Sequence, residues 1–178
     1  MGISNEKAVI LDSNAMNRAI ARISYEIIEK NKGVGDLCII GIMSRGVELA
    51  NRISDKIFEV EGVRVPTGYL DITLHRDDKM RDNDYCDKSQ IDFEFKDKRI
   101  VLVDDVIYTG RSIRAAIDAI MSRERPKSIS LAVLIDRGHR ELPIRADYIG
   151  KNVPTSANEK VKVNVIERDG IDKVSIWS

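Results

Sequence analysis

Two adjacent carboxylates, Asp104 and Asp105, end an almost purely aliphatic run in the stretch VLVDDVIYTGRS. Side by side, these acids repel each other, so a nearby group should favour negative charge or hydrogen-bond acceptors. Hydroxyl groups meet that need, because ionised carboxylates accept hydrogen bonds and donate none. The pair predicts a subsite for a ligand rich in hydroxyls.

The segment directly after the acids has the composition of a phosphate cradle. It connects a predicted strand to a predicted helix, and the free amides and dipole of a helix N-terminus favour an anion. Thr109 and Ser112 add hydroxyl donors, Gly110 lets the backbone approach a ligand, and Arg111 adds charge. The spacing matches neither a Walker loop nor a GxGxxG turn, which favours a monophosphate. A ribose 5-phosphate would satisfy both the acids and this loop.

Two other interpretations of the acid pair stay open at this point. Adjacent acids at a strand end are often a solvated turn, or the Mg²⁺ site of a receiver domain. Receiver domains place the acids at the end of their first strand, whereas several elements precede Asp104 and Asp105 here. The attached phosphate loop therefore favours the ribose interpretation.

The elements around this loop alternate between helix and strand. Periodicity predicts a helix from Ser13, a second with one apolar face from Val47 to Val60, and a third at residues 111–121. Buried strands are predicted at residues 37–42, about 64–72, 99–104 and 129–135. This order predicts an α/β fold with a doubly wound, mostly parallel sheet in a single domain spanning residues 1–178. Ligands of such sheets bind beyond the carboxyl ends of the strands.

Further unusual segments should gather around the same edge. The triplet Ser44-Arg45-Gly46 follows one strand, and the charged segment 136–143 follows another. Residues 72–95 form a long charged connection, which predicts a flexible functional lid. The final residues, about 150–178, predict a short hairpin or hood over the site.

At this point the residues carry a family resemblance. VLVDDVIYTGRS resembles the 5-phosphoribosyl-1-pyrophosphate (PRPP) motif of type I phosphoribosyltransferases. Longer stretches, among them IGIMSRGVELA, LDITLHRDD and LAVLIDRGHRELPIRADYIGKNVPTS, resemble the PyrR family of pyrimidine-operon attenuation regulators, which are also uracil phosphoribosyltransferases. The resemblance implies conversion of uracil and PRPP to UMP and pyrophosphate. It also implies Mg²⁺ carried by PRPP rather than held by fixed protein ligands.

The resemblance also implies roles for individual residues. Asp104 and Asp105 would grip the ribose hydroxyls and offset positive charge that develops at C1. Arg45, with Ser44 and Gly46, would bind pyrophosphate, and Arg76 would make a closing contact. The base would lie near Ile135, Asp136 and Arg137, where backbone groups could read its edge. The 5-phosphate would be held by Val106, Ile107, Tyr108, Thr109, Gly110, Arg111 and Ser112.

A second activity, RNA binding, is predicted from basic side chains outside the acid pair and its loop. Arg18, Arg22 and Tyr25 share a stripe of the first helix, and Arg140, Arg145 and Lys151 lie in the C-terminal half. Such a surface attracts phosphate backbone, and Tyr25 could stack on an unpaired base. The resemblance implies binding of pyrimidine-operon leader RNA in the presence of UMP. Family members commonly have Thr and His where this chain has Ala21 and Tyr25, so hydrogen-bond capacity is lost here. A solvated or oligomer-facing helix surface is the alternative.

Composition sets the remaining limits. The 178 residues contain 29 Lys plus Arg and 29 Asp plus Glu, so a basic surface must be a local patch. Two cysteines make no disulfide framework, and no apolar run approaches the roughly 18 residues of a membrane span. We expect a cytoplasmic homo-oligomer, a dimer or larger. Two alternatives to the bifunctional protein are a salvage enzyme for uracil or another base without RNA binding, and a regulator that only senses nucleotide.

Overall fold

The computed structural model describes residues 5–78 and 84–178. In order, its elements are β1 (Glu6–Leu11), α1 (Ser13–Asn31), β2 (Leu37–Ile42), α2 (Arg45–Glu61), β3 (Thr67–Leu70), a 3₁₀ turn (Thr73–His75), β4 (Arg99–Ile107), α3 (Arg111–Met121), β5 (Ser128–Asp136), β6 (Tyr148–Asn152), β7 (Lys160–Asn164), α4 (Ile166–Asp169) and β8 (Lys173–Trp177). No helix of the described residues is long and apolar enough to cross a membrane.

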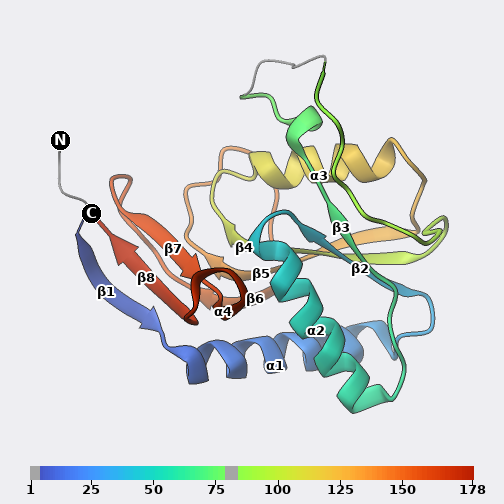
Figure 1. Cartoon of the computed structure of the whole chain (residues 1–178), viewed down its shortest axis with the longest axis horizontal. Helices are drawn as coiled ribbons and strands as arrows, with labels where there is room; N and C mark the ends of the chain where they lie inside the picture. The colour runs from blue at the N-terminus through green and yellow to red at the C-terminus, as the bar shows by residue number, and fades with distance from the viewer. Residues whose placement is uncertain (1–4, 79–83) are drawn as a thin grey trace.

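A five-stranded parallel sheet in the order β3-β2-β4-β5-β6 forms the centre of the molecule. Figure 1 shows α1 and α2 below this sheet and α3 above it. Alternate residues of β4 serve the two faces: Val101 and Val103 pack toward α1 and α2, whereas Ile100 and Leu102 pack toward α3. The predicted doubly wound α/β fold is therefore confirmed.

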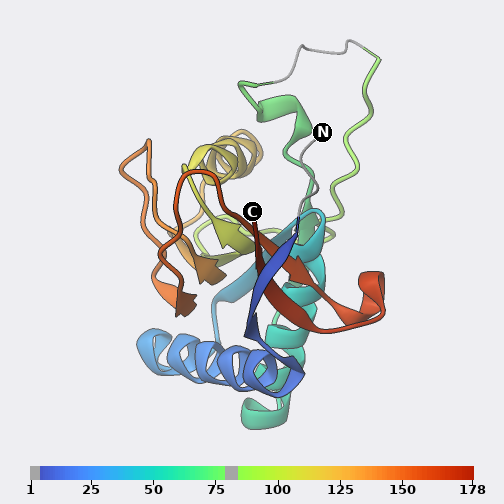
Figure 2. The same ribbon diagram turned by 90° about the vertical axis from the view of Figure 1, so that its left-hand side faces the viewer.

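A second, antiparallel sheet in the order β1-β8-β7 forms a hood beside the main one (Figure 2). The predicted C-terminal hairpin corresponds to β7 and β8, with the single turn α4 between them. The structure corrects two of its boundaries. Residues 148–152 belong to the main sheet, where Tyr148 is buried and pairs with Ala132. The N-terminal strand β1 joins the hood, which the sequence pattern did not indicate.

Two predicted strands have other lengths in the structure. The strand predicted at 64–72 is only the four residues of β3. The strand predicted to end at Asp104 continues to Ile107, because Val106 and Ile107 still pair with Ile135 and Asp136 of β5. The two acids therefore lie within the regular strand β4, whose backbone fixes their positions.

Ion pairs fasten the hood to α2. Arg52 binds two acids, donating to Glu167 at 2.6 Å and to Asp172 at 2.7 Å. Arg168 pairs in the opposite direction with Glu48, at 2.8 Å. Because Asp172 and Arg52 are largely shielded from water, solvent and salt screen the attraction between them less than in an exposed surface pair. The hood is thus held beside the N-terminal half of α2, close to the triplet Ser44-Arg45-Gly46 that follows β2.

Candidate active site

The acid pair occupies the carboxyl end of the central strand β4. Asp104 is buried and Asp105 is partly buried. Burial raises the pKa of Asp104 well above its ordinary value, and the charge of Asp105 adds to the effect. Burial also raises the pKa of Asp105, while its hydrogen bond from the amide of Val106 and the nearby Arg45 oppose the shift. The strand therefore presents two carboxylates that gain from any ligand able to donate hydrogen bonds or positive charge.

The loop after β4 forms a small cradle at the N-terminus of α3. Gly110 directly precedes the helix with a φ of 92°, a left-handed conformation that favours glycine. Thr109 Oγ1 accepts a hydrogen bond from the amide of Arg111 at 3.3 Å. A cavity beside this loop measures about 230 Å³ and is lined by residues 106–113 and 76–78. The predicted phosphate segment is thus brought together with the start of the long charged connection.

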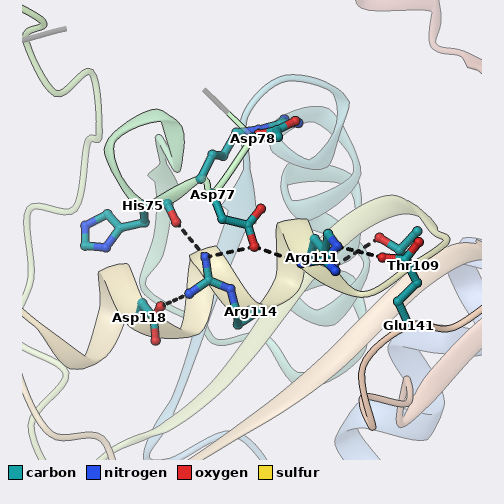
Figure 3. A network of polar contacts seen from close by, with 9 residues as sticks. His75, Asp77, Asp78, Thr109, Arg111, Arg114, Asp118 and Glu141 are labelled. Carbon is teal, nitrogen blue, oxygen red and sulfur yellow. Dashed lines mark hydrogen bonds and ion pairs between the residues drawn. The ribbon is translucent and has the colours of Figure 1, made fainter. Parts of the chain in front are cut away.

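Arg111 in this cradle is held between two acids. Figure 3 shows its guanidinium bonded to Asp77 and to Glu141, at 2.9 and 2.7 Å. One helical turn further, Arg114 donates to the carbonyl oxygen of His75 at 2.8 Å, which fixes residues 75–77 against α3. A phosphate bound at this loop would compete with the carboxylates of Asp77 and Glu141 for hydrogen bonds from Arg111.

A second cavity, about 480 Å³, lies between the acid pair and the N-terminus of α2. Ser44 and Arg45 line it together with Asp104 and Asp105. The guanidinium of Arg45 makes two hydrogen bonds, 2.8 and 3.2 Å, to the carboxylate of Asp169 in the hood. The predicted pyrophosphate triplet therefore does face the acid pair, and its arginine is paired with an acid from α4.

Asp71, at the end of β3, lines the same cavity and is absent from the predicted site. It is buried, yet its carboxylate accepts hydrogen bonds from the Thr73 amide and hydroxyl, from the Tyr85 hydroxyl and from the Lys88 amide. Burial raises its pKa, but these hydrogen bonds outweigh burial and leave it at about 2. The rule that pointed to the other loops, a polar residue directly after a parallel strand, also applies to Asp71.

Arg76 lies at the edge of both cavities. Its guanidinium is bonded to Asp78 through two contacts, 2.8 and 2.5 Å. The closing contact proposed for Arg76 stays a prediction. Of the connection predicted as a flexible lid, residues 79–83 lie outside the described residues.

The predicted base segment is tightly bonded within the fold. Ile135 is fully buried, the carbonyl oxygen of Asp136 accepts from Val153, and the amide of Arg137 donates to Ile107. These backbone groups are therefore already occupied. The Arg137 guanidinium lies 4.0 Å from the ring centre of Tyr108 and donates to the carbonyl oxygen of Glu159. The side chains of Asp136 and Arg137 are further polar groups at this segment, and its role in binding the base stays a prediction.

Five of the six residues predicted to bind RNA fall into two groups. On α1, Arg18 and Tyr25 are exposed, and Arg22 caps the edge of β6 by donating to the carbonyl oxygens of Ile149 and Gly150. A groove of about 780 Å³ is lined by Arg140 and Arg145, together with Asp136 and Arg137 of the base segment. Arg140 is bonded to Asp136 and to the carbonyl oxygens of Tyr108 and Ile144. Lys151 is exposed on β6.

Comparison with known proteins gives consistent results. Residues 8–166 match the family model described as the phosphoribosyl transferase domain. The Bifunctional protein PyrR of Clostridioides difficile is 58% identical over 173 residues, which cover 96% of this chain and 98% of that protein. The Bifunctional protein PyrR of Deinococcus radiodurans is 54% identical and covers 96% of this chain and 94% of its own length.

Solved structures with a similar fold are more distant in sequence. The hypoxanthine phosphoribosyltransferase of Trypanosoma cruzi superposes with a TM-score of 0.73 at 15% identity, covering 96% of each chain. The hypoxanthine phosphoribosyltransferase from Staphylococcus aureus gives the same TM-score at 16% identity, covering 96% of this chain and 92% of that one. At such low identity these neighbours support the fold alone.

Proposed function

Because the chain belongs to the PyrR family of phosphoribosyltransferases, we propose that it transfers the phosphoribosyl group of PRPP to uracil and regulates pyrimidine genes through RNA. The products of the transfer are UMP and pyrophosphate. Assembly into a homo-oligomer and a cytoplasmic location stay predictions from the resemblance.

One observation supports the reaction most strongly: the acid pair lines one cavity together with Ser44 and Arg45, and the loop directly after the pair lines an adjoining cavity. PRPP carries a 5-phosphate at one end of its ribose, a pyrophosphate on C1, and hydroxyls between them. The 5-phosphate fits the cradle of residues 106–112, and pyrophosphate fits the cavity beside Ser44 and Arg45. The hydroxyls would then lie on Asp104 and Asp105.

This arrangement suits a reaction in which C1 becomes positive. The bond from C1 to pyrophosphate breaks as the bond from C1 to N1 of uracil forms, and the proton that N1 carried passes to the departing pyrophosphate or to water. Two preorganised carboxylates near the ribose stabilise the positive charge that develops, without transferring a proton. Arg45 stabilises the departing pyrophosphate, since a guanidinium binds phosphate oxygens through two parallel hydrogen bonds.

The donor set also fits Mg²⁺ bound to PRPP. Asp104 and Asp105 are hard oxygen donors, and burial raises the pKa values of both, so positive charge brought by a ligand would favour their ionised forms. When bound with PRPP, Mg²⁺ would neutralise pyrophosphate charge near these carboxylates. The protein residues would orient that complex.

For the base, we propose a place beside Tyr108 and Arg137. The Arg137 guanidinium lies over the Tyr108 ring, 4.0 Å from its centre, and the two residues directly follow β5 and β4. Uracil is planar and carries hydrogen-bond acceptors, so it could stack on an aromatic ring and accept from a guanidinium there. The alternative, a salvage enzyme for another base, makes the base choice the first point to test.

The enzymatic proposal is tested by measuring UMP formation from uracil and PRPP with Mg²⁺, with hypoxanthine and guanine as competing bases. We expect UMP as the main product. Nucleotide formation only from a purine would contradict the uracil assignment while leaving the phosphoribosyl transfer intact.

For RNA, we propose that Arg18, Tyr25, Arg145 and Lys151 contact the leader, since all four side chains are exposed. Arg22 would contribute from the junction with β6, because half of its side chain remains exposed. Arg140 is more deeply engaged in holding the base segment. A protein that only senses nucleotide would form no UMP from uracil and PRPP. The assay of UMP formation therefore distinguishes this alternative from the enzyme.

We expect pyrimidine-operon leader RNA to bind more tightly when UMP is present. Arg18→Gln and Lys151→Gln should each weaken binding and reduce the slope of log K against log salt by about 0.7 to 0.9, because each removes a phosphate contact. Gel-shift titrations at several salt concentrations measure both quantities. Arg125→Gln is the matched control, since it removes an exposed arginine from the turn before β5. The absence of any UMP-dependent shift would favour the purely enzymatic alternative.

A further inference from the structure

Among the residues that the structure describes, three cationic side chains line the pyrophosphate cavity: Arg45, Arg76 and Lys88. Two of them already have acidic partners: Arg45 is bonded to Asp169 and Arg76 to Asp78. Within residues 5–78 and 84–178, the Lys88 ammonium has no carboxylate partner. Its one charge contact there is with the ring of Tyr85, 5.8 Å away. Lys88 is thus the cavity cation most available to an incoming anion.

The position of Lys88 is fixed by a buried acid. Asp71 accepts a hydrogen bond from the Lys88 amide at 3.2 Å and from the Tyr85 hydroxyl at 2.5 Å. Ser89 Oγ in turn accepts from the Asp71 amide at 2.9 Å. Tyr69 and Gln90 exchange two backbone hydrogen bonds, both 2.8 Å, so residues 85–90 run beside the end of β3. The backbone at Lys88 is therefore anchored to the main sheet.

The chemistry of the expected ligand fits this arrangement. A pyrophosphate group carries several negative charges, and three acids, Asp71, Asp104 and Asp105, also line the cavity. A cation in the lining is therefore needed to offset the repulsion between them. A lysine ammonium contributes a compact charge with three donors, which can serve oxygens of either phosphorus atom. The Asp71 charge is satisfied by its four donors, so it orients Lys88 without needing the ammonium as a partner.

We propose that Lys88 binds the pyrophosphate moiety of PRPP and that Asp71 is the positioning residue that holds Lys88 there. The proposal rests on the phosphoribosyl transfer described above and adds two residues to its pyrophosphate subsite. It distinguishes ligands: PRPP and pyrophosphate contact Lys88, whereas UMP, which has no pyrophosphate, does not.

The test uses the full chain with the exchanges Lys88→Met, Lys88→Arg and, as a matched control, Lys96→Met. Lys96 is exposed, follows the same segment and is not in the cavity lining. Loss of one charged contact should weaken pyrophosphate and PRPP binding by about 10-fold in Lys88→Met. UMP affinity should be unchanged, Lys88→Arg should recover most of the loss, and Lys96→Met should equal wild type. Calorimetry measures all three ligands directly.

Asp71→Asn provides the second measurement. If Asp71 acts through Lys88, this exchange weakens pyrophosphate binding in the wild-type background but adds little in the Lys88→Met background. Equal weakening in both backgrounds would contradict the positioning role. Unchanged pyrophosphate affinity in Lys88→Met, or an equal loss of UMP affinity, would overturn the proposal for Lys88. If wild type binds pyrophosphate but forms no UMP, the proposed function fails while the calorimetry still tests Lys88.

Discussion

Asp105→Asn is expected to lower kcat/KM for UMP formation by about 100-fold or more, because it removes one of two preorganised charges beside the reacting carbon. The exchange conserves size, and the neutral amide can still contact ribose hydroxyls. Binding of UMP should therefore weaken only moderately. Steady-state kinetics together with UMP titration separate the two quantities.

The same exchange is expected to stabilise the fold. Burial raises the pKa of Asp105 above its ordinary 3.8, so the folded state holds the proton more tightly than the unfolded state does. Between pH 3.8 and the raised pKa, the free energy of unfolding of the wild type therefore falls as pH rises. Above that pH window, the charged pair lowers the free energy of unfolding by a constant amount. Asp105→Asn removes it and should raise the free energy of unfolding at neutral pH by about 1 kcal/mol.

The pH profile of activity follows from the same shift. As pH falls through the raised pKa of the pair, a proton neutralises one carboxylate and wild-type kcat/KM should decline. This decline should begin above the range of an ordinary aspartate. Asp55→Asn is the control, because Asp55 lies exposed on α2 and pairs only at the surface with Arg64. An Asp105→Asn variant with wild-type turnover would exclude the electrostatic role of the acid pair.

Much of this site was predictable from sequence, for a definite physical reason. Parallel strands bring their carboxyl ends to one edge, so polar residues after the strands must meet there. That rule predicts that Asp105, Arg45 and the loop around Thr109 lie at one edge of the sheet, and they do line two adjoining cavities there. The helices were equally readable, since α3 has the predicted bounds and α2 ends at Gly62 in a left-handed conformation.

Partners that come from distant chain segments could not be predicted in the same way. Asp169 reaches Arg45 only because the hood packs on α2, and no periodic pattern encodes that contact. Arg22 has the spacing of an exposed basic stripe, yet it also caps the edge strand β6, which itself was not predicted. Asp71 could have been found from its place after β3, but the predicted strand was too long and included it.

Gly46→Ala is expected to lower kcat/KM by about 100-fold although residue 46 offers no side chain to the substrate. A Cβ atom at this position would lie 2.6 Å from the carbonyl oxygen of Val103, closer than real contacts allow. That oxygen belongs to β4, one residue before the acid pair, and cannot move without disturbing the central strand. The N-terminus of α2 must shift instead, and Arg45 moves with it.

A displacement of roughly 1 Å is enough to cost about 100-fold in rate when it misplaces a group that must meet the transition state. The overpacked contact should also lower the free energy of unfolding by about 2 kcal/mol. Kinetics and urea denaturation measure the two effects. Gly35→Ala is the matched control, because a Cβ there meets nothing within 4 Å, and both quantities should stay at wild-type values. Wild-type kinetics in Gly46→Ala would mean that close packing of α2 on β4 does not position Arg45 for the reaction.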